Sequence, residues 1–443
     1  MDLTGHWVGI AAILTFVVAY LVVVAEEFTH LRKSKPMMLA AGIIWAIIAY
    51  QYAAAGETHA VEEAVREFLL EYAELFLFLL AAMTYVNSMT ERRVFDSLRS
   101  WLVRQRFGYR SLFWITGVLS FFLSAVLDNL TTALLMCAVI MAVGRDNARF
   151  VGLGCVSTVV AANAGGAFSP FGDITTLMVW QRGVLDFLTF FNLFVPAAVN
   201  YLVPAALMHF ALPAGTPEPE RQSVRMKRGA MVIVGLFAAT IVTAVSFHYY
   251  LHLPPFLGMM TGLAYLKIYG YYLRVTHHTP TTYENLETGD IEPFDSFREV
   301  SRAEWDTLLF FFGVIMCVGG LGFIGYLSDL SSFMYLELGP TTANVLVGLL
   351  SALVDNIPVM VAVLQMQPDM DVLQWLLVTL TAGVGGSLLS IGSAAGVALM
   401  GQARGAYTFF GHLRWTPAIA LGYALSIWVH MLWNSRLAGI VTG

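Results

Sequence analysis

The sequence predicts an all-α polytopic membrane protein made of two inverted repeats, each with five crossings, one re-entrant hairpin and one broken helix. Three observations carry this prediction. Of 443 residues, 58% are hydrophobic and 12% are charged, whereas soluble proteins carry about 25% charged residues. Apolar segments of roughly 20 residues, long enough to cross about 30 Å of hydrocarbon, recur along the chain. Matching motifs divide the chain into two related halves.

Uninterrupted apolar segments account for eight crossings. The first segment precedes its basic residues Arg32, Lys33 and Lys35 and has no cleavage site of small residues, so we expect a retained helix and not a signal peptide. The predicted spans are 7–27, 37–55, 68–89 and 187–211 in the first half, and 229–250, 255–275, 305–327 and 413–436 in the second.

Two further segments, 111–143 and 342–366, carry an Asp-Asn pair in the middle of an apolar sequence. Each is too short for two comfortable crossings, so we expect a re-entrant hairpin that enters and leaves on the same side. The segments 150–180 and 372–404 are long enough to cross, but a glycine-rich polar stretch interrupts each. We expect these two to be broken helices.

The halves repeat the same motifs in the same order. Residues 124–129 (SAVLDN) correspond to 351–356 (SALVDN), and each motif is followed by a Gly-Gly pair with a third glycine six positions later. Five crossings per half is an odd number, so the repeats should be inverted, which is typical of secondary transporters with a site at the midplane. We place the first repeat at 1–212, a cytoplasmic linker at 213–228 and the second repeat at 229–443. The polar loop 276–304 is expected to be cytoplasmic.

Basic residues predict the orientation of this layout. With both termini outside, all lysines and arginines except Arg66, Arg182 and Arg436 fall in inner segments. This asymmetry is the one that the positive-inside rule demands. The count is the same if the hairpins are full double crossings, so it predicts sidedness and leaves re-entrancy open. For a bacterial inner membrane, both termini would be periplasmic.

Asp128 and Asp355 lie in the middle of the two predicted hairpins, with only apolar and hydroxyl neighbours in sequence. An aspartate at the centre of a membrane helix costs about 2.5–3.5 kcal/mol on insertion scales. The alternative is that one of them lies at the membrane surface. Two Asp-Asn pairs at matching positions favour the functional interpretation, with Asn129 and Asn356 beside the two aspartates.

The glycine-rich stretches offer oxygen ligands. Irregular backbone is tolerated at membrane depth only where protein or a water-filled cavity satisfies its polar groups. Freed carbonyls and the side chains of Asn163, Asp173, Thr175 and Thr176 can then coordinate a cation, while Ser387, Ser390 and Ser393 supply hydroxyls in the second half. Close helix packing is the alternative role of the glycines. Because Asp173 corresponds to Ser393, we place the main cation site in the first half.

The chemistry of these groups points to ion exchange. An all-oxygen ligand set suits a hard cation. The sequence has no HExxH zinc motif and no GxxxxGK loop, so we expect no cofactor, no nucleotide and no nucleic acid partner. A desolvated carboxylate binds either a proton or Na⁺, and binds both poorly at once. The cysteines Cys137, Cys155 and Cys317 are expected to be small buried apolar residues, and histidines such as His412 are expected at the membrane surface.

Five strings carry a resemblance to a known family: AELFLFLLAAMTYVNSMTERRVF, SAVLDNLTTALLM, NAGGAFSPFGDITTLMVW, DNIPVM and GGSLLSIGSAAGVALMG. The chain resembles the NhaD-type sodium/proton antiporters of the ion transporter superfamily. The resemblance implies a bacterial inner-membrane protein that exchanges Na⁺ or Li⁺ for H⁺, a homodimer, and a transport domain that moves like an elevator against a scaffold domain. The residues it implies for cation and proton binding are Asp128, Asn129, Asn163, Asp173, Thr175, Thr176, Ser351, Asn356, Ser390 and Ser393, and Asp355 matches the second Asp-Asn pair; Na⁺ itself is assigned to Asp128, Asn129, Asn163 and Asp173.

Three alternatives stay open. A sodium-coupled anion symporter or oxyanion efflux carrier would use the same layout, but Asp-Asn at each hairpin tip would repel a dicarboxylate. An intramembrane aspartyl protease would also need two aspartates, although the inverted repeat favours transport over an enzyme. A channel is the third, and paired broken helices fit alternating access better.

Overall fold

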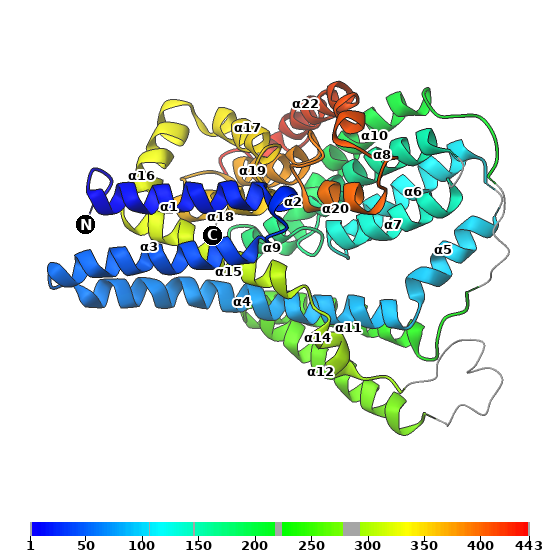
Figure 1. Cartoon of the computed structure of the whole chain (residues 1–443), viewed down its shortest axis with the longest axis horizontal. Helices are drawn as coiled ribbons and strands as arrows, with labels where there is room; N and C mark the ends of the chain where they lie inside the picture. Colours follow the sequence, from blue (N-terminus) through cyan, green and yellow to red (C-terminus); the bar gives the residue numbers. More distant parts are fainter. Residues whose placement is uncertain (1, 106, 145–146, 218–223, 278–292, 442–443) are drawn as a thin grey trace. The chain divides into compact units, whose positions relative to one another are not determined.

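The computed structural model describes residues 2–105, 107–144, 147–217, 224–277 and 293–441 (Figure 1). Residues 218–223 of the predicted linker and 278–292 of the predicted loop lie outside this description. The described residues pack into two compact units, and each unit combines parts of both sequence halves. Unit 1 comprises Met1–Ser97 and Val224–Ser331, and unit 2 comprises Leu98–Ser223 and Ser332–Gly443.

Unit 1 is built from long apolar helices that pack in sequential pairs, α1 on α3 and α11 on α12, with α15 against both α3 and α4. Their bounds are α1 Trp7–Val24, α2 Glu26–Thr29, α3 Ser34–Ala54, α4 Thr58–Glu91, α11 Ala230–Leu251, α12 Pro255–Val275, α14 Ser296–Ser301, α15 Trp305–Phe323 and α16 Tyr326–Ser331, and α5 Val94–Arg104 starts in unit 1 and continues into unit 2.

Unit 2 contains shorter helices and every interrupted one. Their bounds are α6 Tyr109–Ser124, α7 Asn129–Val143, α8 Ala148–Gly166, α9 Ile174–Gln181, η1 Phe187–Leu193, α10 Phe194–His209, η2 Ser332–Glu337, α17 Pro340–Ser351, α18 Asn356–Met366, α19 Val372–Gly385, α20 Ala394–Gln402, α21 Phe409–Leu413, α22 Thr416–Trp433 and η3 Ser435–Leu437. Helix α6 packs on α8, as α17 packs on α19, so the two halves use matching pairs.

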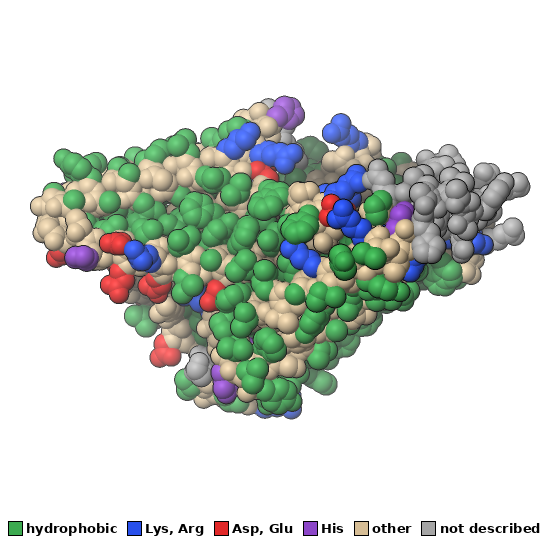
Figure 2. Space-filling view, turned by 90° about the horizontal axis from the view of Figure 1, so that it is seen from below, with side chains coloured by type: hydrophobic (Ala, Val, Ile, Leu, Met, Phe, Trp, Pro, Cys, Tyr) green, Lys and Arg blue, Asp and Glu red, His purple; other side chains and the backbone are tan. Residues whose placement is uncertain are grey.

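The helices bear out the prediction of a multi-pass membrane protein. Within the described residues, eight helices are long and apolar enough to cross a membrane: Trp7–Val24, Ser34–Ala54, Thr58–Glu91, Ala148–Gly166, Phe187–His209, Ala230–Leu251, Trp305–Phe323 and Thr416–Trp433. Helix α12 fills the predicted span 255–275 but is not one of the eight, since tyrosines, glycines and Lys267 make it less apolar. Figure 2 shows a face covered largely by hydrophobic side chains, with charged groups gathered in separate clusters.

The predicted interruptions are present in the backbone. Helix α8 ends at Gly166 and α9 begins at Ile174, while α19 ends at Gly385 and α20 begins at Ala394. The segments around the Asp-Asn pairs are helix pairs, α6 with α7 and α17 with α18, each broken just before the Asp-Asn pair. Each of the four breaks leaves backbone groups that need partners outside the helix.

Glycines allow the close packing around these breaks. A Cβ added to Gly165 would overlap the Phe121 carbonyl oxygen, and one added to Gly385 would overlap that of Gly348. These are corresponding contacts in the two halves, because Phe121 and Gly348 each lie three residues before the repeated serine. Close packing and an interrupted helix, offered above as alternatives, are therefore both true of these glycines.

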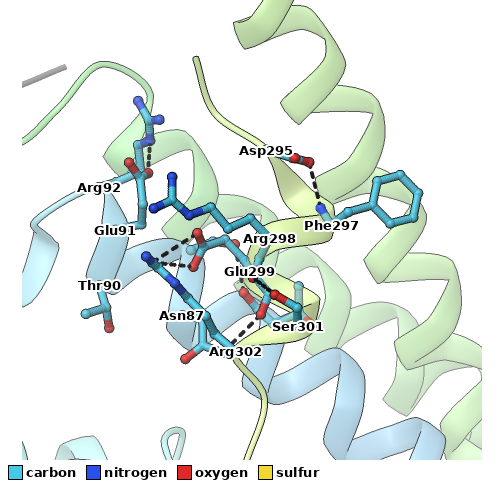
Figure 3. A network of polar contacts seen from close by, with 12 residues as sticks. Asn87, Thr90, Glu91, Arg92, Asp295, Phe297, Arg298, Glu299, Ser301 and Arg302 are labelled. Carbon is cyan, nitrogen blue, oxygen red and sulfur yellow. Dashed lines mark hydrogen bonds and ion pairs between the residues drawn. The ribbon is translucent and has the colours of Figure 1, made fainter. Parts of the chain in front are cut away.

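Charged and polar side chains at the end of α4 and on α14 form a network of contacts in unit 1 (Figure 3). Glu299 on α14 is buried, and both of its oxygens accept hydrogen bonds from Arg302, at 3.2 and 3.3 Å. Its backbone oxygen accepts from Asn87 Nδ2 on α4 at 3.1 Å. Glu91, at the end of α4, pairs with Arg92 and with Lys227, whose Nζ lies 2.7 Å away. Of these contacts, the bond from Asn87 to the Glu299 carbonyl joins the short helix α14 to α4.

Candidate cation-binding site

Four helices of unit 2 begin at the residues that the motifs singled out. Helices α7 and α18 begin at Asn129 and Asn356, directly after an aspartate, while α9 and α20 begin after Asp173 and Ser393. Helix α9 packs against α18, and α20 packs against α7, so each broken helix meets the Asp-Asn helix of the other half. The partial positive charge at helix N-termini favours carboxylates at these positions.

Asp173 is the centre of the site. Its side chain is only 4% exposed. One oxygen, Oδ2, accepts hydrogen bonds from Asn129 Nδ2 at 3.0 Å and from Asn356 Nδ2 at 2.9 Å. The other oxygen, Oδ1, accepts from the Thr175 backbone at 3.1 Å and caps α9. The two asparagines of the repeated Asp-Asn motifs, 227 positions apart in a chain of 443, thus converge on one carboxylate oxygen.

Asn163 extends this cluster and is fully buried. Its Oδ1 accepts from Asn129 Nδ2 at 3.1 Å, and its Nδ2 donates to Ser387 Oγ at 2.9 Å. A carboxylate oxygen only accepts, so the Asn129 atom that faces Asp173 is its amide nitrogen, and the Asn163 atom that faces this nitrogen must be oxygen. Asp173 therefore fixes the orientation of both amides.

Matching serines hold the backbone beneath the cluster in both halves. Ser124 Oγ donates to the Ala162 carbonyl at 2.6 Å, and Ser351 Oγ donates to the Ala382 carbonyl at 2.8 Å. In each half the acceptor lies three residues before the Gly-Gly pair. Ser351 was predicted as a binding residue, and here its hydroxyl is turned to a helix carbonyl, as a brace for the broken helix α19.

Four other predicted residues have hydrogen-bond partners outside the cluster or on its backbone. Asp128 caps α7 through Thr131, whose backbone N and Oγ1 lie 2.8 and 2.6 Å from its two oxygens. Thr176 Oγ1 donates to the carbonyls of Ser169 and Asp173. Ser390 Oγ contacts Met400 Sδ at 3.4 Å, and Ser393 caps α20 through Gly396 N.

Two more predicted residues complete the surroundings of Asp173. Thr175 is fully buried and lies directly beside Asp173, whose carboxylate accepts from its backbone N. Asp355 precedes α18, is half-buried and does not cap that helix with its side chain. The structure therefore joins Asn129, Asn163, Asp173 and Asn356 in one hydrogen-bonded cluster, and the other predicted residues have other partners.

These oxygen ligands suit reversible binding of a small cation. The cluster offers one carboxylate and three side-chain amides, all hard oxygen ligands. In the part of the chain that the structure describes, no group of three or more His, Cys, Asp and Glu is arranged to hold a metal. The cysteines Cys137, Cys155 and Cys317 are buried and free, as expected. The arrangement can bind one small cation or one proton at Asp173.

The sequence did not predict the roles of two residues behind the cluster, Ser387 and His412. Ser387 was noted only as one hydroxyl among three, and His412 was expected at the membrane surface. The His412 side chain is instead fully buried in unit 2, where both of its ring nitrogens have hydrogen-bond partners. Aligning residues 408–412 (TFFGH) with 189–193 (TFFNL) is the signal that would have pointed to it.

The chain is similar over most of its length to proteins named as sodium/proton antiporters. A family model described as citrate transporter matches residues 5–383. The chain is 57% identical to the Na⁺/H⁺ antiporter NhaD of Vibrio cholerae over 98% of its length and 94% of that protein. It is equally similar to the NhaD of Alkalimonas amylolytica, at 57% over 99% of this chain and 93% of the other. A sodium/proton antiporter of Arabidopsis thaliana is 30% identical over 94% of this chain and 71% of its own length.

These relatives are named as antiporters, which are transporters and not enzymes, and their transported ions are substrates and not cofactors. Their similarity extends over nearly the whole chain. The chain therefore belongs to the NhaD-type sodium/proton antiporters.

Proposed function

We propose that this protein exchanges Na⁺ or Li⁺ for H⁺ across a bacterial inner membrane, with Asp173 as the carboxylate for which the two ions compete. The observation that carries the proposal is the convergence of Asn129 and Asn356 on Asp173 Oδ2. A buried carboxylate is costly as a bare charge, so it takes up a proton or a cation. Occupancy by one then excludes the other.

Cation binding would reuse the groups already in place. A half-turn of the Asn129 and Asn356 amides would turn their oxygens to the ion, alongside Asp173 Oδ2. The Asn163 oxygen and the buried Thr175 hydroxyl are further ligands in this proposal. Such a site has one formal charge and mostly neutral oxygens, which favours the modest affinity that release on the far side requires. Asp355, the aspartate of the second Asp-Asn pair, adds negative charge next to Asn356.

Alternating access is the second part of the proposal. All predicted binding residues belong to unit 2, and we propose that unit 2 carries the ion while unit 1 is the scaffold. The matched serine bonds and glycine contacts of the two halves support inverted repeats, with 111–143 and 342–366 as re-entrant hairpins and ten crossings in all. The proposal further includes a homodimer with periplasmic termini.

The test is the pH gradient across everted membrane vesicles, followed with a pH-sensitive dye. Addition of Na⁺ or Li⁺ should collapse the gradient with the wild-type protein and should have no effect with Asp173→Asn. Vesicles with Asp128→Asn test whether the residue that caps α7 is also needed. No response to either cation in the wild type, or full activity of Asp173→Asn, would sink the proposal.

An anion carrier is the second candidate, because the matching family model is described as a citrate transporter. Helix N-termini, which bind anions, do meet in unit 2. However, Asp128, Asp173 and Asp355 lie at three of these N-termini and would repel a di- or tricarboxylate. Sodium-dependent uptake of labelled citrate or succinate into the same vesicles would favour the anion carrier, and its absence would favour cation exchange.

A further inference from the structure

His412 on α21 is a buried residue that contacts the proposed ion site without belonging to it. Its Nε2 lies 2.8 Å from the Ser387 carbonyl oxygen, and its Nδ1 lies 2.8 Å from the Tyr407 hydroxyl. The ring has no exposed surface. A backbone carbonyl only accepts, so Nε2 carries a hydrogen, and Nδ1 of the neutral ring accepts from Tyr407. Both ring nitrogens are therefore satisfied by unit 2.

The acceptor of this bond lies in the break of the second half. Ser387 follows the Gly-Gly pair where α19 ends, so its carbonyl has no partner within the helix. His412 supplies that partner, and Thr416 Oγ1 supplies one for the next carbonyl, Leu388 O, at 2.7 Å. Side chains of one short segment thus fix two successive peptide groups of the break.

Fixing the Ser387 backbone also fixes its hydroxyl. Ser387 Oγ accepts from Asn163 Nδ2 at 2.9 Å, and Asn163 Oδ1 accepts from Asn129, which donates to Asp173. A continuous line of hydrogen bonds therefore leads from His412 to the Asp173 carboxylate. The tie to Ser387 holds the Asn163 amide with its oxygen facing the centre of the site.

The first half lacks both members of this pair. Aligning TFFNL at 189–193 with TFFGH at 408–412 puts Leu193 in the place of His412. Aligning the glycine-rich stretches puts Ala167 in the place of Ser387. Leu193 and Ala167 are both fully buried and apolar. Donor and hydroxyl are thus both present in one half and both absent from the other, as expected if the two act together.

We propose that His412 is a positioning residue for cation binding, acting through Ser387 on Asn163. This inference rests on the proposed function and deepens it, because it names a residue that tunes the affinity of the site without touching the ion. Loss of the His412 bond would free the Ser387 peptide, and Asn163 would then present its oxygen to the ion only part of the time. The Na⁺ concentration at half-maximal exchange should rise, while the maximal rate is preserved.

Five variants test this in the vesicle assay. His412→Leu copies the first half, His412→Gln retains an N–H donor, and Ser387→Ala removes the hydroxyl. The double variant His412→Leu/Ser387→Ala tests whether the two act together. His430→Leu is the matched control, because His430 is also buried and also bonds a backbone carbonyl, that of Leu373 near the start of α19, whereas Ser387 follows the end of that helix. Protein amount in the membrane is measured for each.

The bond to Ser387 is one neutral hydrogen bond, so His412→Leu and Ser387→Ala should each raise the half-maximal Na⁺ concentration roughly two- to tenfold. The double variant should exceed neither by much, since both changes break one line of contacts. His412→Gln should stay near the wild type, and His430→Leu should not shift the Na⁺ dependence. If His412→Leu does not accumulate, the comparison of His412→Gln with Ser387→Ala takes its place.

An unshifted Na⁺ dependence in His412→Leu, the same shift in His430→Leu, or additive effects in the double variant would each overturn the inference. If His412→Leu gives no protein, two other results would overturn the inference. One is a Ser387→Ala variant with the wild-type half-maximal Na⁺ concentration. The other is a His412→Gln variant whose half-maximal Na⁺ concentration rises as far as that of Ser387→Ala. A wild type without any response to Na⁺ contradicts the proposed function itself. Na⁺-dependent thermal stabilisation of the purified protein gives a second readout of affinity that does not depend on turnover.

Discussion

The two interrupted helices of unit 2 share a backbone design and differ in their side chains. In each half the first helix ends at a Gly-Gly pair, and the next helix begins directly after an N-capping side chain. In each half a serine also donates a hydrogen bond to the carbonyl three residues before the glycines. The first half carries Asn163 and Asp173, whereas the corresponding residues of the second are Gly383 and Ser393. The repeat therefore supplies the geometry twice and the charge once.

This difference extends to the contacts between the halves. Asn163 of the first half bonds Ser387 of the second. The reciprocal contact, between Gly383 and Ala167, is apolar and close, since a Cβ on Gly383 would lie 3.4 Å from that of Ala167. Corresponding positions of the two halves therefore make one polar and one apolar version of the same contact. We expect one cation position, off the axis that relates the repeats.

The largest effect should come from the charge that only one half has. Asp173→Asn should reduce Na⁺-driven exchange by on the order of a hundredfold or more, since it removes a buried charge from a hydrogen-bonded cluster. Ser393→Ala, at the corresponding position, should lower it by about threefold or less, as for one neutral hydrogen bond. Rates in vesicles matched for protein amount measure both. Equal losses in the two variants would show that the halves contribute alike.

The next effect concerns the two amide donors. Asn129→Ala and Asn356→Ala each leave Asp173 Oδ2 with one donor. In the proposed bound state each amide oxygen is a ligand of the ion, so each variant removes one ligand and should raise the half-maximal Na⁺ concentration by roughly tenfold or more. Asn129→Ala should cost more, because Asn129 also bonds Asn163.

Asn147→Ala is the control for this pair, because Asn147 caps the start of α8, at the opposite end of that helix from Asn163, and its loss should affect stability alone. A larger shift in Asn356→Ala than in Asn129→Ala would contradict the placement of the main site in the first half.

A smaller and symmetric effect is expected from the glycines. Gly165→Ala and Gly385→Ala both force a Cβ against a backbone carbonyl, so each should cost about 1–3 kcal/mol of stability. Gly401→Ala on α20 meets no atom within 4 Å and should be neutral or stabilising. Thermal unfolding of the purified variants measures this. Strongly unequal losses in the first two would show that the halves do not share one backbone design.

The smallest effect lies outside unit 2, at the Glu299 network of unit 1. Burial raises the pKa of the Glu299 carboxyl, although Arg302 opposes the rise. A raised carboxyl pKa means that docking of α14 is favoured at low pH and loses stability as the pH rises through that pKa. Glu299→Gln should remove this pH dependence. Hydrogen exchange of α14 amides measured across the pH range would test it, and an unchanged pH dependence in the variant would contradict it.

Much of the fold follows from local patterns in the sequence. The apolar segments, the Gly-Gly interruptions and the repeated SAVLDN and SALVDN motifs each depend on neighbouring residues, and the helix ends at Gly166 and Gly385 match them. The position of Asp173 near both asparagines is a different kind of fact. The repeat predicted that Asn129 and Asn356 belong to one site, but not that their amides meet on one oxygen.

What the sequence could not predict is the set of contacts between distant segments. The sequence indicated both Asp128 and Asp173 as cation ligands, and it could not show that the Asp128 oxygens accept from Thr131 while Asp173 accepts from both asparagines. His412 was expected at the membrane surface because it lies near the end of an apolar segment. Only tertiary packing brings it to Ser387, 25 positions earlier in the chain. The division into two units, each mixing both halves, likewise depends on long-range packing.

The most direct test of the central claim, that Na⁺ and H⁺ compete for Asp173, is proton release by the purified protein in weakly buffered detergent solution. Addition of NaCl should release protons from the wild type and from Ser393→Ala, and choline chloride should release none. Asp173→Asn should release none with either salt. Undiminished Na⁺-induced release from Asp173→Asn would contradict the account and would move the exchange site to another carboxylate.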